Sequence, residues 1–366
     1  MSTSRIGIIG CGNISPVYAN TLSEFPWIEV AAFADGIPER AAKFAERYGG
    51  VALELADMLG DDSIDAVVNL TPAHAHASVS RLCLEADKPV FSEKPLGTDF
   101  EEGRSLVELA IDRGLRLGCA PDTFLGAGLQ AARTAIDSGL IGEPIAANGF
   151  SLGFGPEWWH PNPESFYGPG AGPLFDMGPY YLTTLVHLLG PARSISGSAK
   201  IGIAERVMHA KDRVGDVVQA TTPTHVSSMI DFVSGASATL VTSFDVKATR
   251  FKSIEIYGTD GTLSLPDPNT FGGPLKVRSI LADDWHEIPL PTPNIPQQRG
   301  IGLADMLSAT IANRPHRASA QLALHVLELM SSTLRSSDEG RRIDLTTTCE
   351  QPAPMRFHLP ANAFDD

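Results

Sequence analysis

Cysteine is scarce in this sequence, and long apolar runs are missing from it. Only four cysteines occur among 366 residues, and none belongs to a Cys-x-x-Cys pair. This spacing suits neither a disulfide framework nor a zinc site. No apolar run approaches the roughly 18 residues that a membrane-spanning helix needs. The first residues lack the charged, apolar and small-residue order of a secretory signal, which favours a reducing, cytoplasmic location.

Basic residues are also few. Lysine and arginine number 28 against 43 aspartates and glutamates, so the formal net charge is −15. Nucleic acids and anionic membranes are bound through positively charged surface, so neither is expected as the main partner. A local basic pocket for a phosphorylated ligand stays compatible with this charge. The ordinary share of hydrophobic residues, 43%, excludes wholesale disorder.

The first third of the chain alternates between apolar runs and helical patterns. Strands are expected at residues 5–9, 28–34, 64–70, 89–91 and 115–119, and helices at 16–25, 38–48, 75–86 and 99–114. Strands that alternate with helices at this spacing indicate βαβ units, in which a parallel sheet is buried on both faces. The pattern predicts an α/β fold that begins with a doubly wound Rossmann sheet.

The pattern changes after Pro121 and becomes rich in strands. Expected strands cover residues 145–152, 226–233, 238–246, 254–257 and 262–265, and expected helices cover 128–138, 178–189, 303–312 and 318–334. Consecutive strands joined by glycine turns indicate an open, mainly antiparallel sheet. We expect the two late helices to pack against this sheet. The predicted domains are a nucleotide-binding domain at 1–122 and an α+β domain at 123–366.

The strongest local signal is the turn Gly-Cys-Gly-Asn-Ile-Ser at residues 10–15, which follows the first strand and precedes the first helix. Gly10 allows the tight turn, and Gly12 lets the backbone approach a pyrophosphate. The N–H groups that lead into the helix, those of Asn13 and Ile14, would then face the phosphates. Ser15 takes the place of the usual third glycine and is small enough for close packing of helix and strand.

An acidic residue ends the second expected strand. Asp35 lies 20 residues after Ser15, which matches the offset of about 20 for the carboxylate that binds ribose hydroxyls. A carboxylate there accepts hydrogen bonds from the adenosine ribose and repels a 2′-phosphate. The sequence therefore favours NAD as cofactor. NADP stays open, because Arg40 follows on the next helix.

Two further loops follow the third and fourth strands and are expected at the same crevice, because ligands bind beyond the carboxyl ends of parallel strands. Thr71 and Pro72 begin the first loop, which also holds His74 and His76. No acidic or cysteine partner stands near these histidines, so we interpret them as ordering the loop, with no metal site.

The second loop is Glu93-Lys94-Pro95. A lysine at a strand end points a donor and a positive charge into the crevice. Lys94 is placed to hydrogen-bond a substrate hydroxyl and to stabilise the alkoxide that develops as hydride leaves. We expect Glu93 to lie beside the cofactor together with Lys94.

These motifs together resemble the Gfo/Idh/MocA family, the glucose–fructose oxidoreductase and inositol dehydrogenase group. The resemblance spans most of residues 5–335. It is carried by the following segments: GCGNIS at 10–15, TPAHAH at 71–76, SEKPLG at 92–97, LIGEP at 140–144, GAGPLFDMGPY at 170–180 and YGTDG at 257–261. It implies a Rossmann domain, a second domain whose open sheet face commonly forms dimers or tetramers, and a catalytic lysine, here Lys94.

The resemblance also implies a catalytic Asp-x-Gly-x-His motif. Asp176 matches its aspartate, but Tyr180 stands where the histidine is expected. Tyr180 becomes the candidate acid/base if a cation such as Lys94 favours its phenolate. His160 is the alternative proton acceptor, and Trp159 beside it offers an aromatic face to a sugar ring.

The expected function is hydride transfer between a secondary hydroxyl of a sugar, polyol or related compound and NAD(P). It requires Lys94, Asp176 and Tyr180 to meet around the nicotinamide. One alternative is a redox-neutral glycoside hydrolase that keeps NAD bound. Another is a dinucleotide-binding sensor without catalysis, although such a protein would need neither Lys94 nor Asp176.

Overall fold

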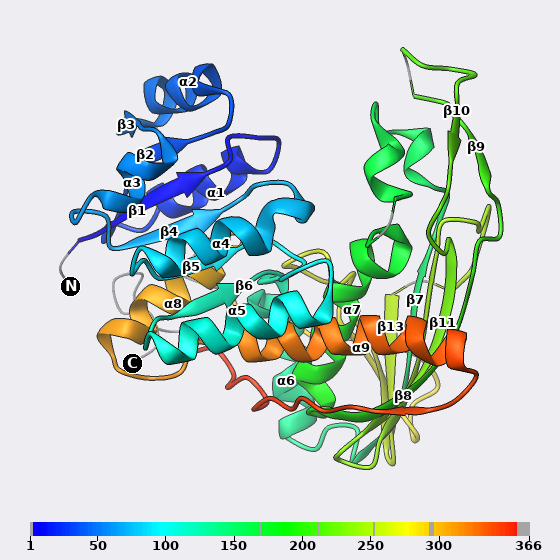
Figure 1. Ribbon diagram of the computed structural model, residues 1–366. Helices are drawn as coiled ribbons and strands as arrows, with labels where there is room; N and C mark the ends of the chain where they lie inside the picture. The colour runs from blue at the N-terminus through cyan, green and yellow to red at the C-terminus, as the bar shows by residue number, and fades with distance from the viewer. Residues whose placement is uncertain (1–2, 169, 211, 252, 293–295, 357–366) are drawn as a thin grey trace. The chain divides into compact units, whose positions relative to one another are not determined.

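The computed structural model describes residues 3–356 except 169, 211, 252 and 293–295. The chain divides into two compact units (Figure 1). The first comprises Met1–Ala127, Pro291–Leu324 and Pro352–Asp366, and the second comprises Gly128–Leu290 and His325–Gln351. Neither unit is therefore one uninterrupted stretch of chain.

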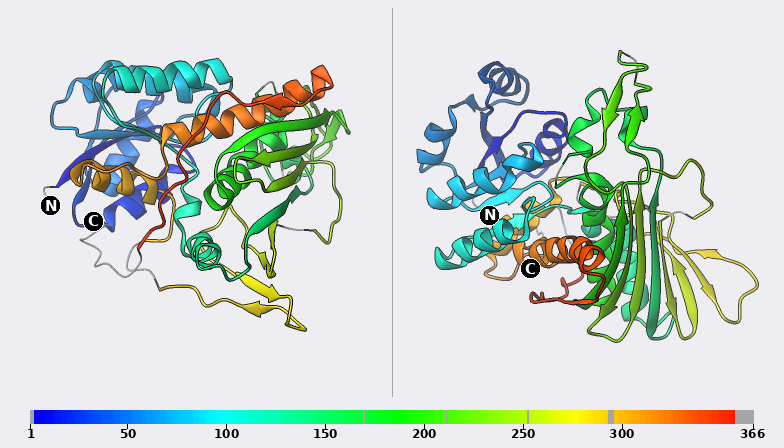
Figure 2. Two further views of the ribbon diagram at one scale, coloured as in Figure 1. Left: turned by 90° about the horizontal axis from the view of Figure 1, so that it is seen from below. Right: turned by 45° about the vertical axis from the view of Figure 1, so that its right-hand side comes forward.

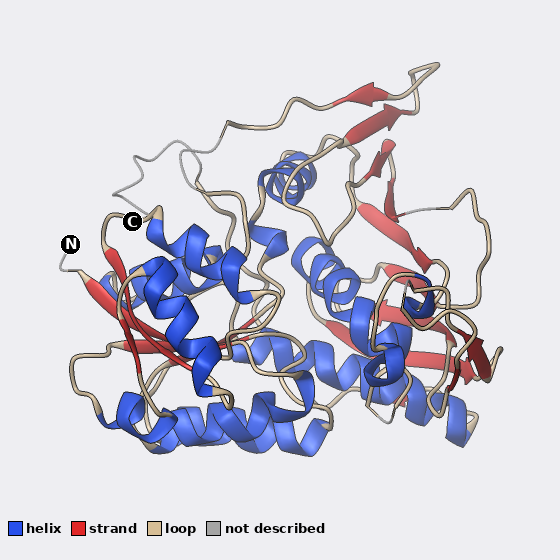
Figure 3. Ribbon diagram, turned by 90° about the horizontal axis from the view of Figure 1, so that it is seen from above, coloured by secondary structure: helices blue, strands red, loops and turns tan. Residues whose placement is uncertain are grey.

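The first unit is built on a six-stranded sheet in the order β3-β2-β1-β4-β5-β6, and every neighbouring pair is parallel. Its strands are β1 Ser4–Ile9, β2 Ile28–Ala34, β3 Val51–Ala52, β4 Ala66–Asn69, β5 Val90–Ser92 and β6 Leu117–Cys119. Its helices in this part of the chain are α1 Ser15–Ser23, α2 Pro38–Tyr48, α3 Leu55–Gly60, α4 His76–Glu85 and α5 Phe100–Asp112, with short 3₁₀ turns at Ala73–Ala75 and Thr123–Leu125. Helices lie on both faces of the sheet (Figure 3), which confirms the predicted doubly wound fold.

Local sequence explains where these elements begin. Pro38 occupies the first turn of α2, where the missing N–H costs nothing. The Asp99 side chain caps α5 by accepting from the N–H groups of Glu101 (2.9 Å) and Glu102 (3.3 Å). The short β3 and α3 were not anticipated, because a two-residue strand carries no periodicity that a sequence pattern can reveal.

The second unit contains a nine-stranded sheet in the order β16-β15-β14-β13-β7-β12-β11-β8-β17 (Figure 2). Only β7 and β12 pair in parallel, so the sheet is mainly antiparallel, as predicted. Its strands are β7 Pro144–Leu152, β8 Ala192–Lys200, β11 His225–Phe232, β12 Ser237–Ser243, β13 Ser253–Gly258, β14 Gly261–Ser264, β15 Lys276–Ser279, β16 His286–Glu287 and β17 Ile343–Asp344. A separate hairpin is formed by β9 Glu205–Val207 and β10 Val217–Gln219.

Helices cover one face of this sheet (Figure 2). The unit contains α6 Ala127–Asp137, which starts one residue before it, short 3₁₀ turns at Pro156–Trp158 and Pro163–Phe166, and α7 Gly172–Leu189. The helix α7 contacts β7, β11 and β12. It begins six residues earlier than residue 178, where the sequence predicted its start, because Pro173 fits a first turn. Asp176 consequently lies on a helix.

The helix α9, Ala320–Glu339, packs against this sheet as predicted. Its residues from His325 onward belong to the second unit. The hydroxyl of Ser336 accepts a hydrogen bond from Gly197 N–H, and that of Ser337 accepts one from Ala199 N–H, both at 2.9 Å. These bonds tie the helix to β8.

The prediction that the other late helix packs on the same sheet is wrong. The helix α8, Ile301–Ile311, belongs to the first unit and contacts β6 and α1. The Asp122 carboxylate accepts from the N–H groups of Gly300 (2.8 Å) and Gly302 (3.0 Å) at the start of α8. Because the helix is buried along nearly its whole length, its apolar pattern does not reveal which sheet it covers.

Candidate functional site

The turn after β1 has the shape that a phosphate-binding turn needs. Gly10 has a φ of +93°, and a Cβ there would lie 2.7 Å from the Leu70 carbonyl group. A side chain at this position would clash, so glycine is required. A Cβ on Gly12 would meet no atom within 4 Å. The N-cap of α1, Ile14, makes no side-chain capping bond, which leaves the start of the helix open to an anion.

Asp35 lies beside this turn at the end of β2. Its Oδ2 accepts from Cys11 N–H (2.7 Å) and its Oδ1 from Ile37 N–H (2.8 Å). A carboxylate oxygen has a second lone pair, so both oxygens remain able to accept from ribose hydroxyls. Ser15 is fully buried and donates to the Gly10 carbonyl at 2.5 Å, consistent with the close packing expected of a small residue. These residues fit the adenosine and pyrophosphate parts of NAD.

Cys11 lies between the two glycines but is not a nucleophile. Burial, together with the nearby Asp35 charge, raises the pKa of its thiol to about 12. The thiol stays protonated near neutral pH, and it is the thiolate that reacts. Cys11 therefore acts as a small apolar residue in the turn.

The strand register brings the predicted loops to one edge of the first sheet. Ile9 pairs with both Ala34 and Asn69, Asn69 with Ser92, and Ser92 with Cys119. The residues that follow these strand ends therefore leave the same edge. They are Gly10, Asp35, Thr71 and Glu93 with Lys94.

Asn69 orders the loop after β4, a role that the sequence analysis missed. Its Oδ1 accepts from the Thr71 hydroxyl (2.6 Å), and its Nδ2 donates to the His76 carbonyl (2.8 Å). The His76 ring is buried between the carbonyls of Thr71 (2.7 Å) and Pro95 (2.8 Å). Burial lowers the pKa of His76. The sequence signal that could have revealed this role is an asparagine at the end of an otherwise apolar strand.

Glu93 and Lys94 follow β5. The Glu93 carboxylate accepts from the hydroxyl of Tyr18 (2.7 Å) and from Lys94 N–H (3.0 Å). The two bonds hold this buried carboxylate against α1 and leave its neighbour Lys94 half-buried. Burial is the largest influence on two nearby groups: it lowers the pKa of His76 and raises the pKa of Cys119. The positive charge of Lys94 acts on both groups as well and lowers each pKa. The ammonium group therefore lies at the sheet edge, and Tyr18 is a supporting residue that the sequence analysis missed.

The second unit contains a cavity of about 670 Å³ beside the start of α7. Its lining includes five aromatic residues and four serines, with Asp176 and Asp267 as acids and Lys276 as a base. The lining residues are Phe150, Ser151, Leu152, Gly153, Phe154, Pro156, Trp159, Asp176, Met177, Tyr181, Ser243, Phe244, Ser253, Ser264, Leu265, Pro266, Asp267, Pro274 and Lys276. Its volume falls within the roughly 300–1,000 Å³ typical of small-molecule pockets. Two predicted substrate residues, Asp176 and Trp159, thus share one cavity.

Tyr180 and His160 do not belong to the described lining of this cavity. Tyr180 lies one helical turn after Asp176 on α7, so the two share a face as predicted, and its side chain is 6% exposed. The adjacent Tyr181 does line the cavity and donates to the Phe150 carbonyl at 3.1 Å. Burial raises the pKa of Tyr181, so it stays a neutral donor.

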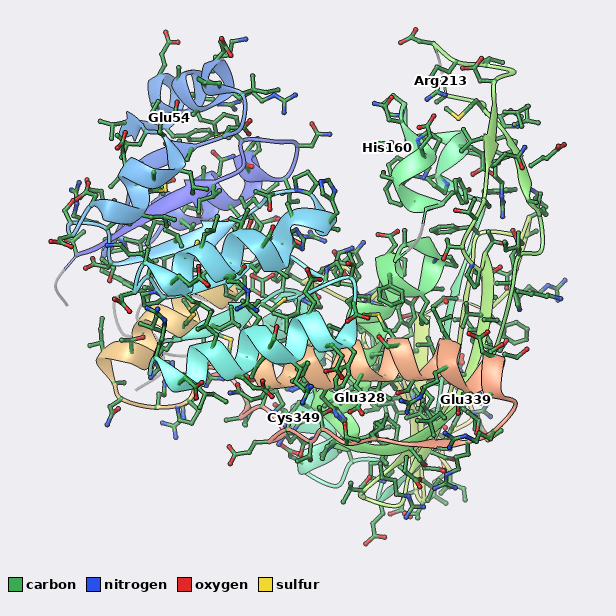
Figure 4. The ribbon with its side chains drawn as sticks, in the orientation of Figure 1. Glu54, His160, Arg213, Glu328, Glu339 and Cys349 are labelled. Atoms are coloured by element: carbon green, nitrogen blue, oxygen red, sulfur yellow. The ribbon has the colours of Figure 1, made fainter. Side chains whose placement is uncertain are left out.

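His160 lies in the segment that follows β7, toward the same end of the second unit as Arg213 (Figure 4). Its Nδ1 accepts from Asn162 N–H at 3.0 Å. A neutral imidazole with an unprotonated Nδ1 carries its proton on Nε2, so that atom donates and does not accept. This bond disfavours His160 as the base that receives a substrate proton.

In the part of the chain that the structure describes, no group of three or more His, Cys, Asp or Glu side chains is arranged to hold a metal ion. None of the described helices combines the length and apolar character needed to cross a bilayer. The four cysteines are buried and free.

Comparisons with known proteins match both parts of the chain to one protein family. Residues 4–120 match the Gfo/Idh/MocA model, described as an oxidoreductase family with an NAD-binding Rossmann fold. Residues 129–264 match the model of that family's C-terminal domain.

Individual relatives agree with the family models. The chain is 25% identical to inositol 2-dehydrogenase from Rhizobium meliloti, over 79% of this chain and 82% of the relative. It is 32% identical to dTDP-3,4-didehydro-2,6-dideoxy-alpha-D-glucose 3-reductase from Actinomadura kijaniata, over 62% of this chain and 68% of the relative. The fold matches levoglucosan dehydrogenase, solved with NADH and levoglucosan, with a TM-score of 0.81 and 19% identity over 94% of this chain and all of that one.

Proposed function

Because this chain belongs to the Gfo/Idh/MocA family of oxidoreductases, we propose that it transfers hydride between a secondary hydroxyl of a sugar, polyol or related compound and NAD. The observation that carries the proposal is the meeting of Gly10, Asp35 and Lys94 at one edge of the parallel sheet. The relatives that reduce or oxidise inositol and sugars support the substrate class. The cavity beside Asp176, with its aromatic and hydroxyl lining, suits a polyhydroxylated ligand.

We propose NAD in preference to NADP. The Asp35 carboxylate, fixed by two backbone N–H groups, would accept from the ribose hydroxyls and repel a 2′-phosphate. The open start of α1 would hold the pyrophosphate. When bound, the nicotinamide supplies the hydride acceptor.

Three side chains carry the proposed chemistry. Lys94 donates a hydrogen bond to the reacting hydroxyl and stabilises the negative charge that develops on its oxygen. Asp176 accepts from a substrate hydroxyl and orients the ring in the cavity. Tyr180, on the same face of α7 as Asp176, acts as the phenolate, which takes the proton from the reacting oxygen and becomes a phenol. The bonded Nδ1 of His160 favours Tyr180 over His160 for this role.

Lys94→Ala tests the proposal. NAD reduction by the wild-type protein is followed at steady state over a panel of sugars and polyols. The variant is expected to lose about 10²–10³-fold or more in kcat, because it lacks the donor that stabilises the alkoxide. Its affinity for NADH, measured by fluorescence, should stay near the wild-type value.

Lys43→Ala removes an exposed lysine from α2 and serves as the control. A Lys94→Ala protein that turns over at the wild-type rate would remove Lys94 from the mechanism. A wild-type protein that binds NADH but reduces NAD with no member of the panel would contradict the proposed function.

We also propose that the protein acts in the cytoplasm as a homodimer or homotetramer. Four buried free thiols suit a reducing compartment. The face of the nine-stranded sheet opposite α7 and α9 exposes Met229 and leaves Phe150 and Val241 half-covered. These apolar side chains, which share the face with Ser196, Thr239 and Asn148, suit a mixed interface with a second copy of the chain.

A further inference from the structure

Three large aromatic rings are exposed within six residues of the segment that follows β7. Phe154, Trp158 and Trp159 are 47%, 43% and 65% exposed. Phe154 and Trp159 line the cavity, whereas Trp158 does not belong to its described lining. The aromatic surface therefore continues from the cavity onto the outside of the unit. We call these three residues the aromatic shelf.

The shelf is held in a defined arrangement. The Trp158 ring stacks on His209 with centroids 3.8 Å apart and ring planes 9° from parallel. Phe154 packs against Trp158 at 5.1 Å. The Lys247 ammonium lies 5.5 Å from the Phe154 centroid and 6.0 Å from that of Trp158. Rings that are already fixed lose little freedom when a ligand stacks on them.

A buried ionic group holds the segment that carries the shelf. The guanidinium of Arg206 pairs with Glu157, which lies within the shelf segment, and with Asp245, which follows β12. It also donates to the carbonyl of Phe244, a cavity residue, at 3.1 Å. The Tyr167 hydroxyl donates to Glu157. Burying these charges is costly unless the geometry is well defined, so the group indicates a segment built to keep one shape.

The cavity is also larger than a single sugar requires. A monosaccharide has about a dozen non-hydrogen atoms, whereas cavities of about 300–1,000 Å³ enclose drug-sized ligands. The cavity of about 670 Å³ lies in the middle of that range. Cavity and shelf together therefore offer room for two rings, the first beside Asp176 and the second against the shelf.

We propose that the aromatic shelf is a second binding position and that the substrate is a glycoside, in which the oxidised sugar is joined to a second ring. This inference rests on the proposed function. The second ring needs a flat apolar face, which is presented both by the C–H face of a pyranose and by an aryl group. Stacking on Trp158 and Phe154 would hold it, since aromatic rings bind such faces edge to face or offset.

Paired substrates test the proposal in the NAD-loaded enzyme. NAD reduction is measured for glucose, phenyl β-glucoside and cellobiose, for galactose, phenyl β-galactoside and lactose, and for mannose and xylose with their phenyl glycosides. We expect kcat/KM of a glycoside to exceed that of its free sugar by about tenfold or more, mainly through KM, because one stacked ring contributes about that factor. Comparing phenyl glycosides with disaccharides distinguishes an aryl group from a sugar as the second ring.

Variants then assign the effect to the shelf. Trp158→Ala is expected to bring the ratio of glycoside to free-sugar kcat/KM close to one, whereas Trp158→Phe, which keeps a ring, should retain most of it. Val217→Ala, an exposed apolar residue of the β9–β10 hairpin, is the matched control and should leave the ratio at the wild-type value. Thermal unfolding of each variant shows whether it is folded.

The outcomes separate the two proposals. Free sugars and glycosides that are oxidised with equal kcat/KM, or a ratio that survives in folded Trp158→Ala, would overturn the second binding position and leave hydride transfer standing. NAD reduction with a polyol, but with none of these sugars and glycosides, would overturn this inference alone. Failure of every sugar, glycoside and polyol to reduce NAD would overturn the proposed function and this inference with it.

Discussion

At the residue scale, Asp122 is an acidic side chain buried in the first unit. Its side chain is fully buried, and its Oδ2 accepts from two backbone N–H groups at the start of α8. Among the described residues no donor reaches its Oδ1. Burial raises the pKa of Asp122 to about 6, and the Glu93 charge acts in the same direction. The folded protein therefore holds this proton more tightly than the unfolded chain does.

Asp122→Asn should change how stability depends on pH. The stability that comes from protonated Asp122 is present below the unfolded pKa and is lost as pH rises through about 6. Asparagine keeps an acceptor for both N–H groups without a charge. We therefore expect the free energy of unfolding of Asp122→Asn to exceed that of the wild type by about 3 kcal/mol at pH 7. At pH 4 the two free energies of unfolding should be nearly equal.

Urea unfolding between pH 4 and pH 8 measures this difference. The same replacement at Asp99, an exposed helix cap, controls for the loss of one acidic side chain. A difference between Asp122→Asn and wild type that is constant over this pH range would refute the assignment.

At the element scale, the β9–β10 hairpin and the segment after β7 depend on one buried cation. The Arg206 guanidinium forms ion pairs with the carboxylates of Glu157 and Asp245. It also lies 5.1 Å from the centroid of the Tyr167 ring. A small apolar cluster packs around it, formed by Tyr167, Met208, Ala210, Val218, Ala220 and Phe244. Removing the cation leaves two carboxylates without a compensating positive charge from Arg206, although Tyr167 and Thr224 still donate hydrogen bonds to them.

Arg206→Met should destabilise this part of the second unit. We expect a loss of about 3–5 kcal/mol, the usual cost of breaking a buried ion pair from one side. Hydrogen exchange should accelerate in β9 and β10, while β11 and β12 keep their protection. Arg104→Met, which breaks an exposed ion pair on α5, is the control and should change little. Wild-type exchange rates in Arg206→Met would mean that the hairpin is held by the apolar cluster alone.

At the scale of the whole molecule, the proposed assembly depends on the face of the nine-stranded sheet that lies opposite α7 and α9. Met229, on β11, is 62% exposed on a strand whose alternate residues are buried under the helices. A charge placed there would have to be buried in an interface between two copies, which is costly.

Met229→Asp should therefore convert the proposed homodimer or homotetramer into smaller species. Size-exclusion chromatography with light scattering measures the mass of both proteins at micromolar concentration. Val214→Asp, at an exposed position between β9 and β10, is the control and should keep the wild-type mass. A wild-type protein that runs as a monomer would contradict the proposed assembly.

Much of the fold could be predicted because the signals are local. The burial of parallel strands on both faces produces continuous apolar runs such as residues 28–34, and a positive φ at Gly10 restricts that position to glycine. Asp35 and Lys94 were predicted in the same way, since each lies within two residues of a strand end. The sequence by itself thus determined the Rossmann sheet, the family and the residues expected at the cofactor.

Tertiary structure decided what depends on pairs of residues far apart in the chain. Tyr18 supports Glu93 across 75 residues, and Asp122 meets Gly300 across 178. A single sequence does not encode which distant partner a buried tyrosine or aspartate will find, because that choice depends on how the elements pack. The same reason explains why α8 lies in the first unit, why Tyr181 lines the cavity, and why the aromatic shelf has its shape.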